Sequence, residues 1–176
     1  MATCCCPGKA SDVSESRCPS SGSAGVAVDL QTVKALLTDT ALRRLNVAKH
    51  RFCPDPTCDV VYFDVTGRTF GTGDVRVAVW QKQPFGRRPI CYCFGESEAS
   101  IQMELEDAGR SLAVERVREY IRAGRCACGV RNPRGSCCLA DVAAAVKRVE
   151  SAWTDRLNVR MESEDVHAAG SRPRHR

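Results

Sequence analysis

The cysteines are the residues of this chain best suited to chemistry, and they occur in tight groups. Two of these groups lie in the second half of the sequence: Cys91 and Cys93, then Cys126, Cys128, Cys137 and Cys138. Four cysteine sulfurs can hold an iron-sulfur cluster, in which a Cys-x-Cys element directs two sulfurs at one iron while a distant pair takes the other. The spacing therefore predicts a metal cluster.

A further set of thiols lies in the first half of the sequence. Cys53 and Cys58 enclose a proline-containing turn that holds the two thiols near each other, and Cys18 precedes them. The run Cys4-Cys5-Cys6 near the start can capture a soft metal such as Cu(I), or it can be cysteine tolerated in an exposed arm.

The sequence predicts a cytoplasmic protein whose cysteines bind metal. Residues 1–9 hold no apolar run of the length that a signal peptide needs, and the chain has no run of about 18 apolar residues. Clustered thiols in the reducing cytoplasm are metal ligands or redox thiols, with a disulfide framework as the alternative. The net charge of +5 is scattered and aromatic residues make up 6% of the chain, so we expect neither a nucleic acid nor a membrane as partner.

Composition divides the chain into two small modules between polar ends, which is an α+β organisation. We expect a flexible Cys/Ser-rich arm at residues 1–17, a small antiparallel β module at 18–86, a helical module at 87–155 and a disordered basic tail at 156–176. Prolines, a glycine and arginines mark the boundary near residue 86. Modules of this size commonly need a metal or a disulfide to be stable.

Apolar spacing and capping residues predict the elements that position the thiols. One or two short helices are expected between Val28 and Leu45, the second capped by Thr38 or Asp39; strands at 50–52, 60–65 and 75–80; and helices at 97–107, 111–121 and 139–153, the first two capped by Ser97 and Ser111. Cys138 directly precedes the last helix, where the helix dipole and free backbone amides favour a thiolate.

The cysteine groups of the second half resemble two metal-binding families. Cys91-Tyr92-Cys93-Phe94-Gly95, followed by two helices and a returning cysteine loop, is similar to the module named after bacterioferritin-associated ferredoxin. The run from Cys128 through Asn132-Pro133-Arg134-Gly135 to Cys137-Cys138 resembles the amino-terminal part of CopZ-type copper chaperones. The resemblance implies an all-helical ferredoxin-like module whose [2Fe-2S] cluster is held by Cys91, Cys93, Cys128 and Cys138, with Cys126 and Cys137 as spare thiols.

The resemblance to CopZ-type proteins covers residues 18–140 and so includes the first half. There it implies one structural, tetrahedral zinc bound by a zinc-knuckle module, with Cys18, Cys53 and Cys58 as ligands. Ser21 stands where the family has its remaining cysteine, and a serine hydroxyl keeps its proton at neutral pH. The site is therefore one thiolate short.

The missing ligand leaves several possibilities open. We expect one cysteine of the Cys4-Cys5-Cys6 run to complete the site, with His50 or water as alternatives. An open position is also the geometry of catalytic zinc, for which Asp55 and Asp59 are the nearby acid-base candidates. A final alternative is that zinc is lost and the cysteines simply pack.

The resemblance implies an intracellular metallochaperone-like protein that gives one-electron support to the trafficking of copper or a related soft metal, its cluster reducing Cu(II) to Cu(I). The family's copper-carrying carboxy-terminal domain has no match before Arg176, so the expected partner is a separate copper or mercury carrier or transporter, or a redox partner protein. The alternatives are a [2Fe-2S] electron-transfer partner of an oxidoreductase and a redox-sensing structural metal-binding protein. Hydrolase and nucleotide-binding motifs are absent, so the expected enzymatic activity is at most the reduction of Cu(II).

Overall fold

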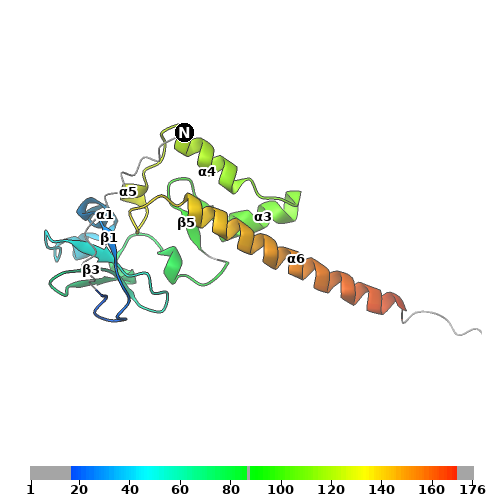
Figure 1. Cartoon of the computed structure of the whole chain (residues 1–176), viewed down its shortest axis with the longest axis horizontal. Helices are drawn as coiled ribbons and strands as arrows, with labels where there is room; N and C mark the ends of the chain where they lie inside the picture. Colours follow the sequence, from blue (N-terminus) through cyan, green and yellow to red (C-terminus); the bar gives the residue numbers. More distant parts are fainter. Residues whose placement is uncertain (1–16, 87, 170–176) are drawn as a thin grey trace, which may run out of the picture.

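The computed structural model describes residues 17–86 and 88–169. In this part of the chain a small sheet with short helices lies beside a group of longer helices, and the last helix projects away from both (Figure 1). The expected α+β class is confirmed. The Cys4-Cys5-Cys6 run, with most of the expected arm, and the end of the expected tail lie outside the described residues.

An antiparallel sheet forms the first half, with the strand order β1-β2-β3-β4. Its strands are β1 Val26–Val28, β2 His50–Phe52, β3 Val60–Asp64 and β4 Thr69–Gly71. β3 is buried along its whole length, and Tyr62 lies opposite Phe52 of β2. Its β-branched and aromatic residues suit a central strand that is covered on both faces. The strands predicted at 50–52 and 60–65 are confirmed.

Two short helices, α1 Leu30–Leu36 and α2 Asp39–Leu42, pack on this sheet. The fully buried Leu37, between them, belongs to one hydrophobic cluster with Phe70 of β4. Thr38 caps α2 as predicted, because its hydroxyl accepts a hydrogen bond of 3.3 Å from a backbone N–H of the first turn. The helices therefore begin where the sequence places them.

The strand predicted at residues 75–80 is not formed. The chain passes from β4 through the 3₁₀ turn η1, Thr72–Asp74, and then runs along the end of α1. The backbone N–H of Arg76 donates to the carbonyl of Leu36 at 2.8 Å, in place of a strand neighbour. The alternation of apolar and polar residues instead reflects packing against the helix end, where Val79 is buried.

The second half is helical but, contrary to the all-helical expectation, includes a two-stranded sheet. After the 3₁₀ turn η2 Trp80–Lys82, which closes the first half, its elements are the strands β5 Pro89–Cys91 and β6 Glu96–Ser97, and the helices α3 Glu98–Ala108, α4 Ala113–Arg122, α5 Cys128–Arg131 and α6 Leu139–Ala169. The chain reverses at Gly95, which has φ +75° and whose N–H donates to the Cys91 carbonyl at 2.8 Å. The Cys-x-Cys element therefore lies in a hairpin, a short-range structure that helical periodicity in the following residues does not reveal.

The capping residues predicted for the second half take part in the helix starts. Ser97 caps α3 and accepts a hydrogen bond of 3.1 Å from a backbone N–H of its first turn. Ser111 lies one residue before the α4 cap and accepts from the backbone N–H of Ala113 at 3.3 Å. The helices enclose one core, which includes Ile90, Ile101, Leu105, Val117, Val142, Ala145 and Val149.

The final helix is longer than the sequence predicts. α6 continues past Trp153 to Ala169 and enters the segment for which a disordered tail is expected. This segment contains no glycine or proline before Gly170, so the backbone meets no helix-breaking residue there. Figure 1 shows the helix extending well beyond the rest of the molecule. Among the described residues, no helix is both long and apolar enough to cross a membrane.

The two halves share an interface through the loop after α5. The hydroxyl of Tyr62, on β3, donates to the backbone carbonyl of Pro133 at 2.9 Å. The hydroxyl of Thr32, on α1, donates to the carbonyl of Gly129 on α5, and Figure 1 shows α1 and α5 next to each other. The sheet of the first half therefore supports the cysteine loop of the second.

Candidate metal centres

Two separate turns position the first group of thiols: one holds Cys18, and the other, between β2 and β3, begins at Cys53 and ends at Cys58. Cys18 lies in a turn closed by hydrogen bonds of 2.8 Å from its own N–H to Ser23 and from the N–H of Gly22 to its carbonyl. Cys53 directly follows β2, and its N–H donates to the carbonyl of Val61 at 2.9 Å. Cys58 ends the proline-containing turn, two positions before β3 begins. The sheet therefore fixes the relative positions of these turns.

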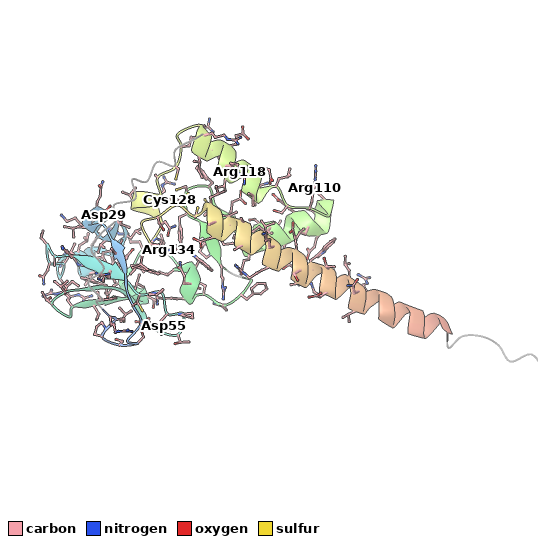
Figure 2. All side chains as sticks on the ribbon, in the orientation of Figure 1. Asp29, Asp55, Arg110, Arg118, Cys128 and Arg134 are labelled. Carbon is pink, nitrogen blue, oxygen red and sulfur yellow. The ribbon has the colours of Figure 1, made fainter. Side chains whose placement is uncertain are left out.

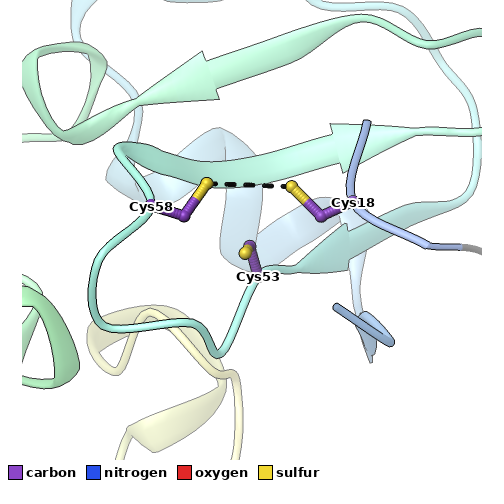
Figure 3. Close-up of side chains that lie close together, drawn as sticks. All are labelled: Cys18, Cys53 and Cys58. Atoms are coloured by element: carbon purple, nitrogen blue, oxygen red, sulfur yellow. Dashed lines mark hydrogen bonds between the residues drawn. The ribbon is translucent and has the colours of Figure 1, made fainter. Parts of the chain in front are cut away.

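The structure brings the predicted zinc ligands together. The Sγ atoms of Cys18, Cys53 and Cys58 all lie within 4.8 Å of one another, and those of Cys18 and Cys58 are 3.9 Å apart. Figure 3 shows the three side chains directed at a common point. A tetrahedral zinc with sulfurs at about 2.3 Å separates each pair of sulfurs by about 3.8 Å. The observed spacing fits such an ion.

Ser21 lies at this thiol group, whereas His50 does not. The hydroxyl of Ser21 is 3.5 Å from Cys53 Sγ and also hydrogen-bonds Cys18. In the described part of the chain, the donors within 4.8 Å of one another here are the three thiols, without His50. The Nδ1 atom of His50 hydrogen-bonds the Ala48 carbonyl at 2.8 Å instead. Of the expected fourth ligands, His50 is therefore wrong, and Ser21 occupies the neighbourhood of the thiols.

The thiols of this group differ in their readiness to ionise. Burial opposes ionisation of Cys18, but hydrogen bonds from Ser21 outweigh it and lower the pKa of that thiol from 9.0 to about 7. Burial raises the pKa of Cys53. Lys82 donates to the carbonyls of Asp55 and Cys58 at 2.8 and 2.7 Å, which places a positive charge at the turn. Metal binding at this group must therefore release protons from the thiols. The nearby positive charge of Lys82 favours this proton release, because it stabilises the thiolates.

The nearby carboxylates have structural partners. Asp55 accepts hydrogen bonds from the N–H of Thr57 at 2.9 Å and from the hydroxyl of Ser23 at 3.2 Å. Asp59 accepts from the hydroxyl of Thr72. Both carboxylates close turns, so the geometry gives the acid-base alternative no support. Cys58, Asp59 and Lys82 line an open cleft of about 270 Å³, which gives this side of the thiol group access to solvent.

The second group of thiols comes from the ends of four elements. Cys91 ends β5, Cys93 lies in the following turn, Cys128 begins α5 and Cys138 directly precedes α6. The Sγ atoms of Cys93 and Cys128 are 3.8 Å apart. Cys138 hydrogen-bonds both Cys91 and Cys128. All four predicted cluster ligands therefore lie in one continuous group, and Figure 2 places Cys128 between the sheet and the helices.

Cys126, predicted to be a spare thiol, lies in this group as well. Its Sγ is 3.3 Å from Cys128 Sγ, and Cys93, Cys126 and Cys128 have their sulfurs within 4.8 Å of one another. The sequence held a signal for this placement, because Cys126-Ala127-Cys128 repeats the Cys-x-Cys spacing of Cys91-Tyr92-Cys93. Cys137 belongs to neither of the groups of sulfurs that lie within 4.8 Å of one another in the described chain.

Proton sharing makes the thiols of the second group unequal. The thiol of Cys138 donates to Cys128 and lowers the pKa of Cys128 from 9.0 to about 5, and its hydrogen bond also lowers the pKa of Cys91. The same hydrogen bonds raise the pKa of Cys138. Burial raises the pKa of Cys93 to about 11 and raises that of Cys126. Thiolate character therefore falls on Cys128, although the helix start predicted it for Cys138, because direct sulfur contacts act at shorter range than the helix end.

The loop between Cys128 and Cys138 is held by its own side chains. Asn132 is buried; its side-chain amide donates to the carbonyl of Ser136 at 2.8 Å, and its side-chain oxygen accepts from the N–H of Arg134 at 3.0 Å. Gly135 has φ +64° and approaches α1 so closely that an added Cβ would lie 3.0 Å from the hydroxyl oxygen of Thr32. The loop therefore needs asparagine and glycine at these positions to bring Cys138 back to Cys128.

The donor chemistry of both groups suits soft or borderline metals. Sulfur dominates each group, and thiolates prefer zinc, Cu(I) and iron-sulfur clusters over the hard cations that bind oxygen. The three thiols supply three of the four donors of a tetrahedral zinc site, and four thiols from separated elements fit the cysteine requirement of a [2Fe-2S] cluster.

Known proteins share this organisation. Residues 15–76 match the CopZ-type family described as a zinc binding domain. The chain is 31% identical over 123 residues to the copper chaperone CopZ of Archaeoglobus fulgidus, an alignment that covers 69% of this chain and 57% of that protein, little more than half its length. The X-ray structure of the Archaeoglobus fulgidus CopZ N-terminal domain superposes with a TM-score of 0.57 at 30% identity, covering 70% of this chain and 92% of that one. Over this region the chain therefore belongs to the CopZ family, as a homologue of the CopZ amino-terminal domain with its zinc binding domain.

Proposed function

We propose that the chain is a metallochaperone-like protein that binds zinc and a [2Fe-2S] cluster and gives one-electron support to copper trafficking. The single observation that carries the proposal is the presence of two separate cysteine groups, each assembled from distant segments, in a chain homologous to a copper chaperone. Packing alone does not require thiols from so many segments, because apolar side chains already make up most of the core in each half.

Zinc is the proposed occupant of the first group. Cys18, Cys53 and Cys58 supply three sulfurs, and the hydroxyl of Ser21 or an added thiolate from residues 1–16 supplies the remaining donor. The match of residues 15–76 to a zinc binding domain supports this ion. The role of the zinc is structural, because its ligands join the turn at Cys18 to the turn that connects β2 and β3.

A [2Fe-2S] cluster is the proposed occupant of the second group, with Cys91, Cys93, Cys128 and Cys138 as ligands. Their mutual hydrogen bonds and burial support a common site. Bound there, such a cluster supplies single electrons, and one electron separates Cu(II) from Cu(I). The residues of the chain hold the sulfurs, exclude water on the side of Cys91 and Cys138, and leave Cys93 half-buried at the surface.

The proposed partners are a copper carrier or transporter that receives Cu(I) and a redox partner protein that supplies the electron. The homology to a copper chaperone supports the first of these. The half-buried Cys93 and Cys126 give the second a side of the site from which to approach.

Metal analysis with electron paramagnetic resonance tests the proposal. Anaerobically purified or reconstituted protein is expected to contain about one zinc and about two irons per chain, and dithionite reduction is expected to give a one-electron signal. Cys128→Ser should abolish the iron and keep the zinc, Cys53→Ser should abolish the zinc, and Cys137→Ser should keep both. Protein that takes up no iron on reconstitution contradicts the cluster, and a reduced cluster that leaves Cu(II) unreduced contradicts the role in copper trafficking.

A further inference from the structure

The second cysteine group contains a thiol that the proposed cluster does not use. We call Cys93, Cys126 and Cys128 the outer thiol triad, because their sulfurs lie within 4.8 Å of one another and Cys126 is half-buried. The Sγ atom of Cys128 is 3.8 Å from that of Cys93 and 3.3 Å from that of Cys126. Among the described residues, the other group with this mutual proximity is the candidate zinc site.

The backbone places Cys126 in the triad. After α4 the chain turns sharply, because the N–H of Arg125 donates to the carbonyl of Tyr120 and the N–H of Gly124 to that of Ile121, both at 3.0 Å. Two residues after Arg125, the backbone N–H of Ala127 donates to the sulfur of Cys93 at 3.3 Å. The residues on either side of Ala127 therefore face Cys93 without depending on a flexible side chain.

Burial divides the whole cysteine group into an inner and an outer side. Cys91 and Cys138 are 1% and 2% exposed and lie among the apolar residues of the helical core. Cys93 and Cys126 are half-buried, and Cys128 connects the two sides through its contacts with Cys138 and with Cys126. Cys128 is itself 2% exposed, so an ion arriving from solvent meets Cys93 and Cys126 first and Cys128 behind them.

The number and type of donors select the ion. In the described chain, no fourth histidine, cysteine or carboxylate lies within 4.8 Å of all three sulfurs of the triad. Structural zinc is almost always four-coordinate, whereas soft thiolates also select Cu(I), which three sulfurs can satisfy. A metal with sulfurs at about 2.3 Å in a plane around it separates them by about 4 Å, close to the spacing between Cys93 and Cys128. We propose that the outer thiol triad is a binding site for a single Cu(I) ion.

The triad shares two sulfurs with the proposed cluster. Cys93 and Cys128 belong to both sets, so one chain can hold the cluster or this Cu(I), but not both at once. This exclusion rests on the proposed function, whereas the triad itself rests on its own geometry. Cu(I) in excess is therefore a competitor of the cluster at its outer side.

A Cu(I) titration of the full chain tests the triad. Iron-free, zinc-loaded protein with Cys4, Cys5 and Cys6 changed to serine is titrated anaerobically against bicinchoninate, which competes for Cu(I). The expected result is a single tight Cu(I), with three sulfur neighbours by X-ray absorption. Cys126→Ser should weaken this binding at least about tenfold, since loss of a ligand exceeds the effect of an outer-shell change. Cys137→Ser, in the loop between α5 and α6 and outside the triad, should leave it unchanged.

Several results would overturn the proposal. Equal Cu(I) affinity in Cys126→Ser and Cys137→Ser would exclude Cys126 as a ligand. Fewer than three sulfur neighbours around copper in the parent protein would exclude the triad, whatever the affinities of the variants. Retained zinc in both variants shows that the fold is intact. Protein that binds the cluster but, when iron-free, binds no tight Cu(I) contradicts the triad alone. Protein that binds Cu(I) at the triad but never takes up iron contradicts the proposed function alone. If Cu(I) binds to reconstituted protein and the iron content stays the same, the cluster and the Cu(I) do not exclude each other.

Discussion

The two cysteine groups differ in how many sulfurs they gather and in where those sulfurs come from. The first joins three thiols from turns next to one sheet, with a serine hydroxyl beside them. The second joins five thiols from the ends of β5, α4, α5 and α6. The first group is thus one thiol short of a tetrahedral zinc site, and the second has one more than a cluster requires. The surplus lies on the solvent side, where exchange of metal is easiest.

The groups also differ in what supports them. The first depends on hydrogen bonds within the sheet module, such as that from Cys53 to Val61. The second depends partly on its neighbour, because Tyr62 and Thr32 of the sheet module hold the loop that carries Cys128 and Cys138. Loss of the metal from the first group should therefore weaken metal binding at the second group. Loss of the metal from the second group should leave metal binding at the first unchanged. Four variants test this asymmetry.

The largest effect is expected from Cys53→Ser. This change removes a buried thiol that we propose as a zinc ligand, and a metal at a thousand times its Kd stabilises the folded state by about 4 kcal/mol. Denaturant unfolding with and without zinc should show a loss of this size, and the irons of the second group should become labile to chelators. Cys93→Ser is the reciprocal control, since it should release iron and keep zinc. Zinc loss in both variants would contradict the asymmetry.

A smaller effect is expected from Tyr62→Phe, which acts on the junction alone. The change leaves the buried carbonyl of Pro133 without its donor, at a cost of about 1–3 kcal/mol. Zinc content should stay the same, and a chelator should remove iron faster than from the parent protein. Thr66→Val is the control, because its hydroxyl donates to Asp64 within the sheet module at 2.6 Å and does not contact the cysteine loop. Equal iron release from the two variants would show that Tyr62 does not support the loop.

The sequence predicts the thiol groups better than it predicts the geometry between them. The short turn between Cys53 and Cys58 indicated these two thiols as a pair, and the resemblance to CopZ-type proteins added Cys18 to them. The hairpin at Gly95 was missed, since β5 and β6 are too short to produce a period. Cys126 was set aside because its place depends on the turn after α4 and on contact with Cys93, and contact between distant segments leaves no local pattern. The strand predicted at residues 75–80 was wrong for the same reason, as the end of α1 decides its conformation.

Ser21→Cys should give the first cysteine group the fourth thiol that it lacks. Ser21 already hydrogen-bonds Cys18 and Cys53, so a thiol at this position lies among the ligands. A fourth thiolate should strengthen zinc binding at least about tenfold, which is about 1.4 kcal/mol. Competition with a chromophoric chelator measures the change. The serine variant of Cys4, Cys5 and Cys6 separates the alternatives: if these residues already supply a thiolate, it will lose affinity and Ser21→Cys will restore it. Unchanged affinity when Ser21→Cys is added to that serine variant would show that position 21 lies outside the coordination shell.

The smallest effect is expected from Glu104→Gln, which changes the stability of the protein in acid without removing a thiol. Burial opposes ionisation of Glu104, but hydrogen bonds from the hydroxyl of Ser111 and the N–H of Leu112, and the charge of Arg116, outweigh it and lower the pKa of Glu104 below 4.5. A carboxyl whose pKa is depressed by folding stabilises the protein above its unfolded pKa, and this contribution is lost as the pH falls through the folded pKa. Glu104→Gln should cost about 1 kcal/mol at pH 7, and this cost should shrink as the pH falls to 3 and the carboxylate takes up its proton. Since thiols also lose metal in acid, the comparison is made on protein stripped of metal, by denaturant unfolding at both pH values. A cost that is the same at pH 7 and pH 3 would show that packing, and not the charge of Glu104, stabilises the start of α4.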